Sequence, residues 1–418
     1  MLRFASHALA TCASIAGLAL LASTASAQLP SHPPQLTVRP DGSDMGPDPF
    51  ENPEEPEFGR TVVIRDELAF VGMPAHSLGG RVAIFRATPT ALLRTGTLTA
   101  SDAVRGARFG RSLAYRDGIV VVGDDKAAYV FQRSNGVWKQ RQKLTAPAAD
   151  NVGSFADALR YEEGTLAIGA NNAGGTPGAV YIYERSSTGK FVLRSKLVST
   201  DSAPNDGFGA AISTAGPVMV VGAPGIGTAY VFRRNSSGVW RQHQTLIASE
   251  LGPGSRTGFG GALAIDRGMI IVGAPGVPGD DEDPTDFPRR AGAAYGFVAD
   301  SGLYVETFKL RPRPDEIDRF AFFGRQVAMF GERIVVEAQH GYLCTCGSQL
   351  NGSLAFTYTR AGSSVMARGV AGLQGTFAST SLSLANQRLV VGEPCTSTFD
   401  GGCLGGGRVQ LYNLNVFE

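Results

Sequence analysis

The sequence has few of the features on which helical proteins, membrane proteins and nucleic-acid-binding proteins depend. No long stretch places apolar residues at positions i, i+3, i+4 and i+7, so amphipathic helices are not expected. Beyond the N-terminal region, no apolar segment approaches the roughly 20 residues needed to cross a bilayer. Lysine is scarce, and without Arg3 the chain has 37 basic residues against 37 acidic ones. This balance argues against nucleic acid or an anionic membrane as a partner, because both require a basic surface.

Histidine and tryptophan are also scarce. Beyond residue 27 the histidines are His32, His76, His243 and His340. Their spacing fits no helical zinc motif, so no metal is assigned to them. Trp138 and Trp240 are the only tryptophans, which argues against a lectin with a tryptophan platform in every repeat.

The N-terminal region is typical of an export signal. Arg3 precedes an apolar run of small residues and leucines that ends at Ala25-Ser26-Ala27, a small-x-small cleavage site. The most apolar part, residues 15–22, is too short to span a bilayer. A lipoprotein would use Cys12, but this residue precedes most of the apolar run. We therefore expect residues 1–27 to be a cleaved signal peptide and the protein to be secreted, either extracellular or periplasmic.

A regular repeat takes the place of the missing helical pattern. A Phe followed by Gly or Ala occurs at Phe58-Gly59, Phe109-Gly110, Phe155-Ala156, Phe208-Gly209, Phe259-Gly260, Phe323-Gly324 and Phe377-Ala378. Fourteen residues after the first six phenylalanines come Gly72, Gly123, Gly169, Gly222, Gly273 and Glu337, and Gly392 follows the seventh at fifteen. A fixed internal distance between variable flanks indicates a rigid unit joined by loops of free length.

Each repeat contains four predicted strands. In the fifth repeat, residues 262–265 and 269–273 form a hairpin with a tight turn at Asp266-Arg267-Gly268. A third strand has aromatic residues at alternate positions, which favours core packing over a ligand site. A fourth strand carries a recurring Leu at 95–101, 141–147, 194–200, 243–249 and 307–313, and this pattern is degenerate in the sixth repeat. Seven such units predict an all-β fold, a seven-bladed β-propeller over residues 58–418 with four antiparallel strands per blade.

The two ends of the chain are predicted to close the ring. The seventh repeat has only three strands, the last at 408–412, which would leave an unpaired sheet edge. Residues 34–40, PQLTVRP, resemble the fourth-strand pattern at 142–147. We expect the N-terminal segment 28–57 to supply the closing strand of the last blade, followed by a connector rich in proline and acidic residues.

These motifs resemble the FG-GAP repeats of integrin α-subunit heads, which many exported bacterial proteins also carry. The resemblance rests on the Phe-Gly pairs with Gly222-Ala223-Pro224 and Gly273-Ala274-Pro275, and it covers residues 58–418. It implies a platform that binds proteins or partner subunits, with each Phe wedged between neighbouring blades. Family members often bind calcium through an Asp-x-Asp-x-Asp-Gly loop between the first two strands. The corresponding turns here are too short to hold those ligands, so no calcium site or other cofactor is assigned.

Two polar clusters are weaker candidates for a site. Asp280, Asp281, Asp283 and Asp286 lie in a long loop of the fifth repeat and are candidate metal ligands. Their spacing lacks the alternation and central Gly of a calcium loop, so a solvated loop is the simpler interpretation. Cys344, Cys346, Cys395 and Cys403 remain in the secreted chain, and their even number indicates disulfides. We expect a Cys395–Cys403 bridge, with cross-blade pairing and a metal site as alternatives.

The sequence favours an exported, non-catalytic binding or adhesion module with a protein or glycan ligand. A propeller enzyme acting on extracellular polysaccharide is the alternative, but it would gather acids and histidines at one ring face, and here they are scattered across repeats. A purely structural surface protein is a third possibility. Long loops at 276–292, 338–352 and 393–407 share the face of the inter-blade connections, and we expect a partner to bind there.

Overall fold

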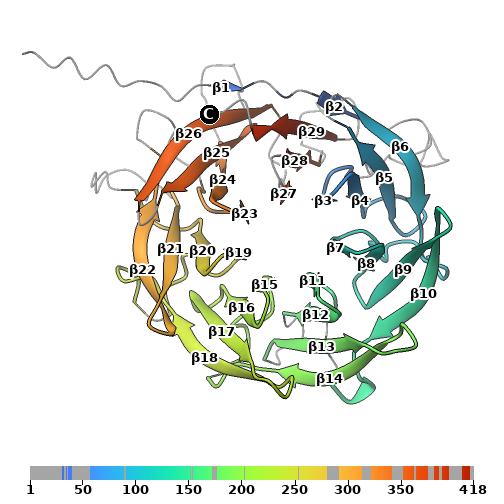
Figure 1. The fold of residues 1–418 in the computed structure, drawn as a ribbon, viewed down its shortest axis with the longest axis horizontal. Coiled ribbons are helices and arrows are strands. Elements are labelled where there is room, and N and C mark those ends of the chain that lie inside the picture. The colour runs from blue at the N-terminus through green and yellow to red at the C-terminus, as the bar shows by residue number, and fades with distance from the viewer. Residues whose placement is uncertain are drawn as a thin grey trace, which may run out of the picture.

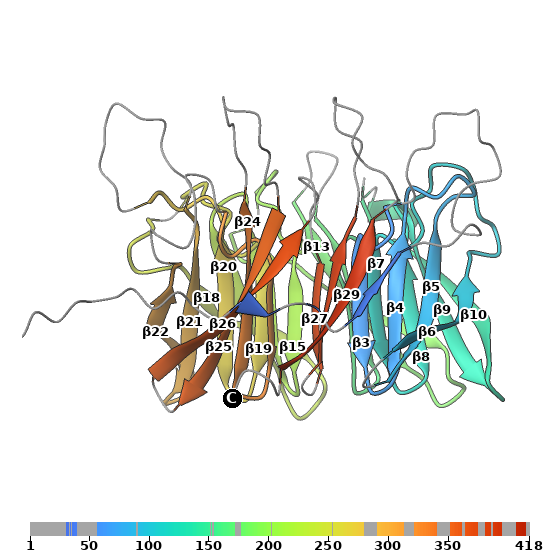
Figure 2. The same ribbon diagram turned by 90° about the horizontal axis from the view of Figure 1, so that it is seen from above.

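The computed structural model describes residues 31–414 apart from several gaps. The residues outside the description are 1–30, 33, 35, 40–56, 89–90, 151, 153, 172–176, 202, 253, 280–290, 313–321, 341–351, 362–363, 375–380, 386–387, 395–406 and 415–418. The described residues form seven sheets arranged as blades around a central axis (Figure 1). The strands run along that axis, as the side view shows (Figure 2). The predicted all-β, seven-bladed propeller is confirmed.

Each blade is a meander whose first strand lies nearest the axis (Figure 1). Blade one contains β3 (Thr61–Arg65), β4 (Leu68–Met73), β5 (Arg81–Ala87) and β6 (Leu92–Leu98). Blade two contains β7 (Ser112–Arg116), β8 (Ile119–Gly123), β9 (Ala127–Ser134) and β10 (Val137–Thr145). After the short 3-10 helix η1 (Ala148–Asp150), blade three contains β11 (Leu159–Glu162), β12 (Thr165–Ala170), β13 (Ala179–Arg185) and β14 (Phe191–Leu197). Blade four contains β15 (Ile212–Ala215), β16 (Val218–Ala223), β17 (Thr228–Arg234) and β18 (Trp240–Leu246).

The remaining blades include the two ends of the described chain. Blade five contains β19 (Ala262–Asp266), β20 (Met269–Ala274), β21 (Ala293–Asp300) and β22 (Leu303–Leu310). Blade six contains β23 (Val327–Phe330), β24 (Arg333–His340), β25 (Gly352–Ala361), β26 (Ser364–Gln374) and β1 (Ser31–His32). Blade seven contains β27 (Ser381–Ala385), β28 (Arg388–Glu393), β29 (Arg408–Asn413) and β2 (Leu36–Val38).

The N-terminal strand closes the ring as predicted. Strand β2 pairs antiparallel with β29, in the register Leu36 with Leu411, Thr37 with Gln410 and Val38 with Val409. Leu36 and Val38 also pack against the hydrophobic cluster between blades seven and one. Just before it, β1 adds a parallel fifth strand to blade six. The segment therefore joins the outer edges of the last two blades.

The fourth strands differ from their predicted limits. The strand expected at 95–101 is Leu92–Leu98, and the other four are likewise displaced toward the N-terminus. The fourth strand starts directly after its hairpin, and residues beyond the recurring Leu belong to the inter-blade connection. The sixth repeat was expected to be degenerate here, yet β26 is an 11-residue strand. Its backbone pairs with β25 without the Leu pattern, because ladder hydrogen bonds do not depend on side chains.

The first hairpin of each blade is as tight as predicted. In blades two, three and five, two residues with positive φ connect the strands, for example Asp117 at 51° and Gly118 at 71°, or Arg267 at 44° and Gly268 at 72°. Positive φ at both central residues defines a type I′ turn, whose twist matches that of paired strands. These turns lie on one side of the ring, along the lower edge of Figure 2. We call this side the hairpin face.

The hydrophobic core is divided into seven clusters, one between each pair of neighbouring blades. Six of them are centred on a repeat phenylalanine that is 0–1% exposed: Phe58, Phe109, Phe155, Phe208, Phe259 and Phe323. Phe109, for example, packs with Val82 of blade one and makes an edge contact with Phe131 of blade two. The predicted wedging of these rings between blades is confirmed, and Phe377 lies outside the described residues.

The repeat glycines allow neighbouring blades to touch through their backbones. A Cβ on Gly222 would lie 1.8 Å from the carbonyl oxygen of Gly260 in the next blade, and one on Gly273 would lie 1.9 Å from that of Gly324. Gly260 and Gly324 have φ of 92° and 91°, a conformation that L side chains resist. A larger residue at either position would separate the blades.

The first prediction concerns ring closure. Deletion of residues 28–57, or the pair Leu36→Asp and Val38→Asp, should lower the melting temperature by several degrees because blade seven loses its outer strand or its packing. Thr37→Asp is the control, because Thr37 is exposed on the same strand. Equal melting of the deletion and the full secreted chain would show that the strand does not stabilise the ring.

The second prediction concerns blade contact. Gly222→Ala should destabilise the fold by roughly 3 kcal/mol or more, because the methyl group collides with a neighbouring backbone. Gly96→Ala is the matched strand control, since its Cβ would meet only Ile84 Cδ1 at 3.7 Å. Urea denaturation of both variants measures the difference, and equal effects would refute backbone contact as the constraint.

Candidate functional site

Most of the weaker sequence candidates lie outside the described residues. These are the signal peptide, the acidic residues Asp280, Asp281, Asp283 and Asp286, and all four cysteines Cys344, Cys346, Cys395 and Cys403. The metal, disulfide and export predictions for them therefore stay predictions, as does a partner site on the three long loops. Among the described residues, no group of three or more His, Cys, Asp or Glu is placed to hold a metal ion. Within the same residues, no helix is long and apolar enough to cross a membrane.

The first recurring polar arrangement ties four inter-blade connections to the blades that follow them, blades two to five. The hydroxyl of Tyr181 donates to Asp150 Oδ2 at 2.8 Å, and Lys196 Nζ donates to Asp150 Oδ1 at 2.8 Å. Lys196 also lies over the Tyr181 ring, 5.6 Å from its centre. Tyr295, Glu250 and Lys309 repeat the arrangement in blade five. We call these Tyr–acid–Lys groups the latches.

The other two latches are variants. In blade two, Lys143 donates to Asp102 at 2.6 Å, whereas the Tyr129 hydroxyl donates to Asp124 at 3.1 Å. In blade four, Tyr230 donates to Asp201 at 2.7 Å, but Thr245 stands where the other latches have lysine. Every hydrogen bond of the latches joins groups of the fold to one another, so their role is structural.

The pKa values of three latch carboxylates are shifted by their hydrogen-bond partners. The hydrogen bond from Lys143 lowers the pKa of Asp102, and those from Lys196 and Tyr181 lower that of Asp150. Partial burial acts to raise the pKa of Glu250, but Lys309 and Tyr295 outweigh it and the net shift is downward. These three latches therefore favour the ionised acids.

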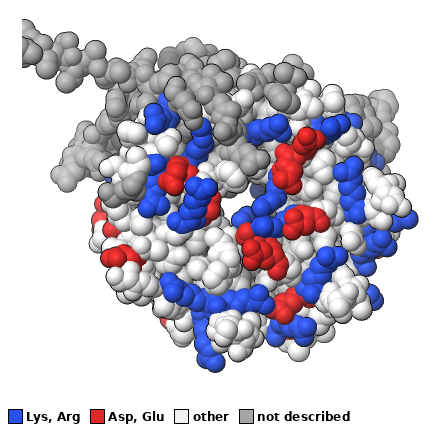
Figure 3. Space-filling view, in the orientation of Figure 1, with Lys and Arg blue, Asp and Glu red and all other residues white. Residues whose placement is uncertain are grey.

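The second polar arrangement surrounds the central channel. The channel holds a cavity of about 340 Å³ at the hairpin face, lined by residues from the inner strands of all seven blades. Charged side chains of both signs gather around the hollow at the centre of the ring (Figure 3). We call this cavity the channel mouth. Its lining includes the charged residues Arg65, Asp66, Arg160, Glu162 and Asp266.

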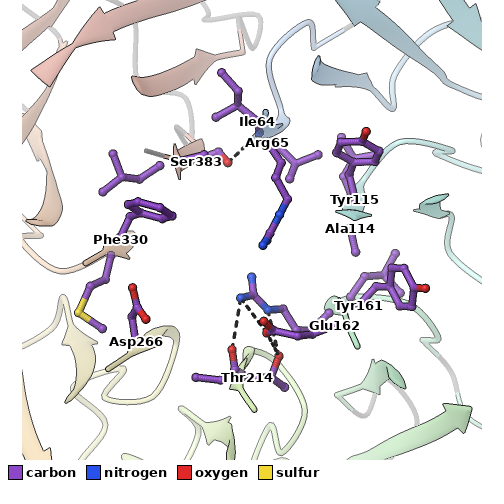
Figure 4. Close-up of a pocket in the computed structure, with 18 of the residues that line it drawn as sticks. Ile64, Arg65, Ala114, Tyr115, Tyr161, Glu162, Thr214, Asp266, Phe330 and Ser383 are labelled. Atoms are coloured by element: carbon purple, nitrogen blue, oxygen red, sulfur yellow. Dashed lines mark hydrogen bonds and ion pairs between the residues drawn. The ribbon is translucent and has the colours of Figure 1, made fainter. Parts of the chain in front are cut away.

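Glu162 organises one side of the channel mouth. Its Oε1 accepts from Arg116 Nη1 of blade two at 2.5 Å. Its Oε2 accepts from the Thr214 hydroxyl of blade four at 2.9 Å and lies 3.5 Å from Arg160 Nη2. Arg160 itself donates to the Thr214 hydroxyl and to its backbone oxygen, at 3.2 and 3.3 Å. One carboxylate thus connects three consecutive blades, and Figure 4 shows its contact with Thr214.

The opposite side of the channel mouth is less enclosed. Asp266 Oδ2 accepts from the backbone N–H of Gly331 at 2.6 Å, which joins blade five to blade six. Phe330 ends strand β23 beside it and keeps 40% of its surface exposed. Figure 4 shows Phe330 and Asp266 across the channel from Tyr115 and Tyr161.

Sequence reasoning missed the channel mouth, although an alignment of the repeats contains a signal for it. The last residues of the seven first strands are Arg65, Arg116, Glu162, Ala215, Asp266, Phe330 and Ala385. Two residues earlier the strands have Val63, Ala114, Arg160, Ser213, Ala264, Ala328 and Ser383. Polar and aromatic residues at these positions vary between blades, whereas the buried positions repeat. A pattern built on the residues that repeats share does not include positions that differ from blade to blade.

A serine that weakly resembled a nucleophile has a structural position. Ser112, in Gly110-Arg111-Ser112-Leu113-Ala114, begins strand β7, and its hydroxyl donates to the backbone oxygen of Ala156 at 2.5 Å. A nucleophile elbow requires a strand-to-helix turn, and here the chain continues as a strand.

The third prediction follows from the latch carboxylates of Asp102, Asp150 and Glu250. Their pKa values are lowered in the folded chain, so they add stability above the ordinary pKa of about 4 and lose it as pH falls through the folded value. The triple variant Asp102→Asn, Asp150→Asn, Glu250→Gln should be about 1–2 kcal/mol less stable than the parent at pH 7. At pH 3 the difference should shrink. Glu163→Gln, at an exposed turn, is the control. A difference independent of pH in urea denaturation would contradict the assignment.

Comparison with known proteins supports the reading of the repeats. Residues 191–232 match the family model of the FG-GAP repeat. The matched segment runs from β14 through Phe208-Gly209 to Phe232 at the third strand of blade four, and so crosses one blade boundary. No curated protein matches the chain. The chain therefore contains a segment similar to the FG-GAP repeat within a seven-bladed β-propeller.

Proposed function

We propose that the chain is an exported, non-catalytic binding module whose rigid ring presents the channel mouth to a protein ligand. The observation that carries the proposal is the position of Phe330. It is the one aromatic residue among the large hydrophobic residues that are exposed in the described part of the chain, and it stands at a cavity rimmed with charged groups. A partly exposed aromatic anchor beside a pocket, within a polar rim, is the usual centre of a protein–protein interface.

The polar groups of the channel mouth favour binding over catalysis. Glu162, Arg116, Arg160 and Thr214 are engaged with one another across three blades. Nucleophilic catalysis needs a hydroxyl or thiol beside a general base. Ser213 and Ser383 instead accept backbone N–H groups of Ile265 and Ile64, at 3.2 and 2.9 Å. Rigid, mutually satisfied groups suit recognition of a preformed shape.

The aromatic residues favour a protein ligand over a glycan. Trp240 is 7% exposed within the cluster between blades three and four, and Trp138 packs against the cluster between blades one and two. The repeat tyrosines, such as Tyr181 and Tyr295, are fully buried. A sugar ring stacks on an exposed aromatic face, and the described outer surface offers few such faces.

The part of the proposal that concerns export is supported by residues 1–27, which resemble a signal peptide.

The test uses residues 28–418, secreted and purified. Proteins captured by this chain from extracellular material would be purified and their affinities measured by interferometry. Phe330→Asp should weaken binding by tenfold or more, because it replaces the anchor with a charge. Val104→Asp is the control, since Val104 is 66% exposed on a connection between blades one and two, away from the channel mouth.

Several outcomes would overturn parts of this proposal. Loss of binding in the control alone, or in variants with shortened loops at 276–292, 338–352 or 393–407, would place the partner on the opposite face. Binding on a glycan array, without a purified protein ligand, would replace the ligand class. Release of sugars from extracellular polysaccharides by the purified chain would show that it is an enzyme.

A further inference from the structure

Two arginines from nonadjacent blades line the channel mouth. Arg65 ends strand β3 of blade one, and Arg160 lies on strand β11 of blade three. Both line the same cavity, and Figure 4 shows that the Arg65 side chain extends into it. Burial lowers the pKa of Arg160, Glu162 opposes that shift, and the positive charges of Arg65 and Arg116 add to it. The two arginines therefore repel one another.

Arg160 is fixed in position. Thr214 accepts two of its hydrogen bonds, and Glu162 lies 3.5 Å away. Glu162 is shared with Arg116, which it meets at the shorter distance of 2.5 Å, so it does not neutralise both cations. Arg160 consequently presents a positive charge of defined position to the cavity.

Arg65 is held differently. In the part of the chain that the structure describes, no hydrogen bond or ion pair engages its guanidinium. Asp66 and Asp266 also line the cavity, and neither forms an ion pair with Arg65 within 4 Å between nitrogen and oxygen. Asp266 belongs to blade five and accepts from Gly331, and Asp66 is exposed at the turn after β3. Its donors are thus directed into a cavity without a partner from the described residues.

We propose that the channel mouth binds a small oxyanion, such as a carboxylate or sulfate group, between Arg65 and Arg160. An oxyanion there would accept from both planar guanidinium forks and remove their repulsion. Apolar residues of the lining, including Leu113, Leu159 and Ile265, exclude water from part of the wall and so strengthen the attraction. The cavity of about 340 Å³ is large enough for the anion together with a small group that carries it.

The anion site goes beyond the proposed function and does not depend on it. The oxyanion can be a free ion or an acidic side chain of a bound protein, since both offer the same oxygen atoms. Free sulfate tests the site directly, without any protein ligand. Once a ligand is purified, competition by sulfate for its binding distinguishes the second source from the first.

The experiment compares Arg65→Met with the parent chain. Without anion, Arg65→Met should melt at the same or a higher temperature, because the repulsion with Arg160 is gone. In sulfate at 10 to 100 times its Kd, the parent should gain about 2–4 °C more than the variant. Sulfate stabilises most proteins by exclusion from their surfaces, and that shift is common to both chains. Sodium chloride of equal ionic strength is the reference.

Two further variants test whether the effect is specific to Arg65 and whether it requires a guanidinium group. Arg86→Met removes an exposed arginine of the same blade that pairs with Glu67 at 3.3 Å, and it should keep the full sulfate shift. Arg65→Lys keeps the charge without the fork and should bind sulfate several-fold more weakly by titration calorimetry. Equal sulfate shifts in the parent and Arg65→Met, or a lower melting temperature of Arg65→Met without anion, would overturn the proposal.

Discussion

The ring depends on close backbone contact between neighbouring blades. The carbonyl oxygen of the glycine in each Phe-Gly pair lies against a glycine on the second strand of the preceding blade, as Gly110 does against Gly72. The amide of the same residue donates back into its own blade, from Gly110 to the oxygen of Gly123 at 3.0 Å. This contact brings the sheets near enough for one phenylalanine to fill the space between them. Each hydrophobic cluster is therefore shared, and a single blade has no complete core of its own.

The channel mouth is a consequence of the same contact. Because the blades approach so closely, the ends of seven first strands meet around one cavity, and residues distant in sequence become neighbours. Glu162 reaches Arg116 and Thr214 across 46 and 52 positions of the chain. These interactions join blades two, three and four directly. The latches act at the connections, and the ion pairs of Glu162 act at the axis.

The sequence predicted what the repeats have in common and little of what distinguishes them. The Phe-Gly pairs, the tight turns and the closing strand at Leu36–Val38 followed from spacing and from the need to pair every edge. The latch acids were not found, because they stand four residues after Leu98, Leu197 and Leu246 but six after Leu144. The position of Arg65 and Arg160 in one cavity was also missed, since the two residues belong to nonadjacent blades and their approach depends on ring diameter. The strand β1 was also not predicted, because two residues are too few to carry an alternating pattern.

In a ring of equivalent units, a ligand must be recognised through positions that are not equivalent. The repeated residues are buried and hold the blades together, so they give every blade the same surface. At the last position of the first strand, however, the chain changes from arginine in blades one and two to acids in blades three and five and to Phe330 in blade six. Arg160 stands two residues before the end of its first strand. In four other blades that position is an alanine or a serine that is at most 9% exposed. Arg160 joins blade three to blade four through Thr214, and 39% of its side chain stays exposed. Glu162 is shared with Arg116 and balances the charge of Arg160 only in part, and an anion supplied from outside would complete the balance.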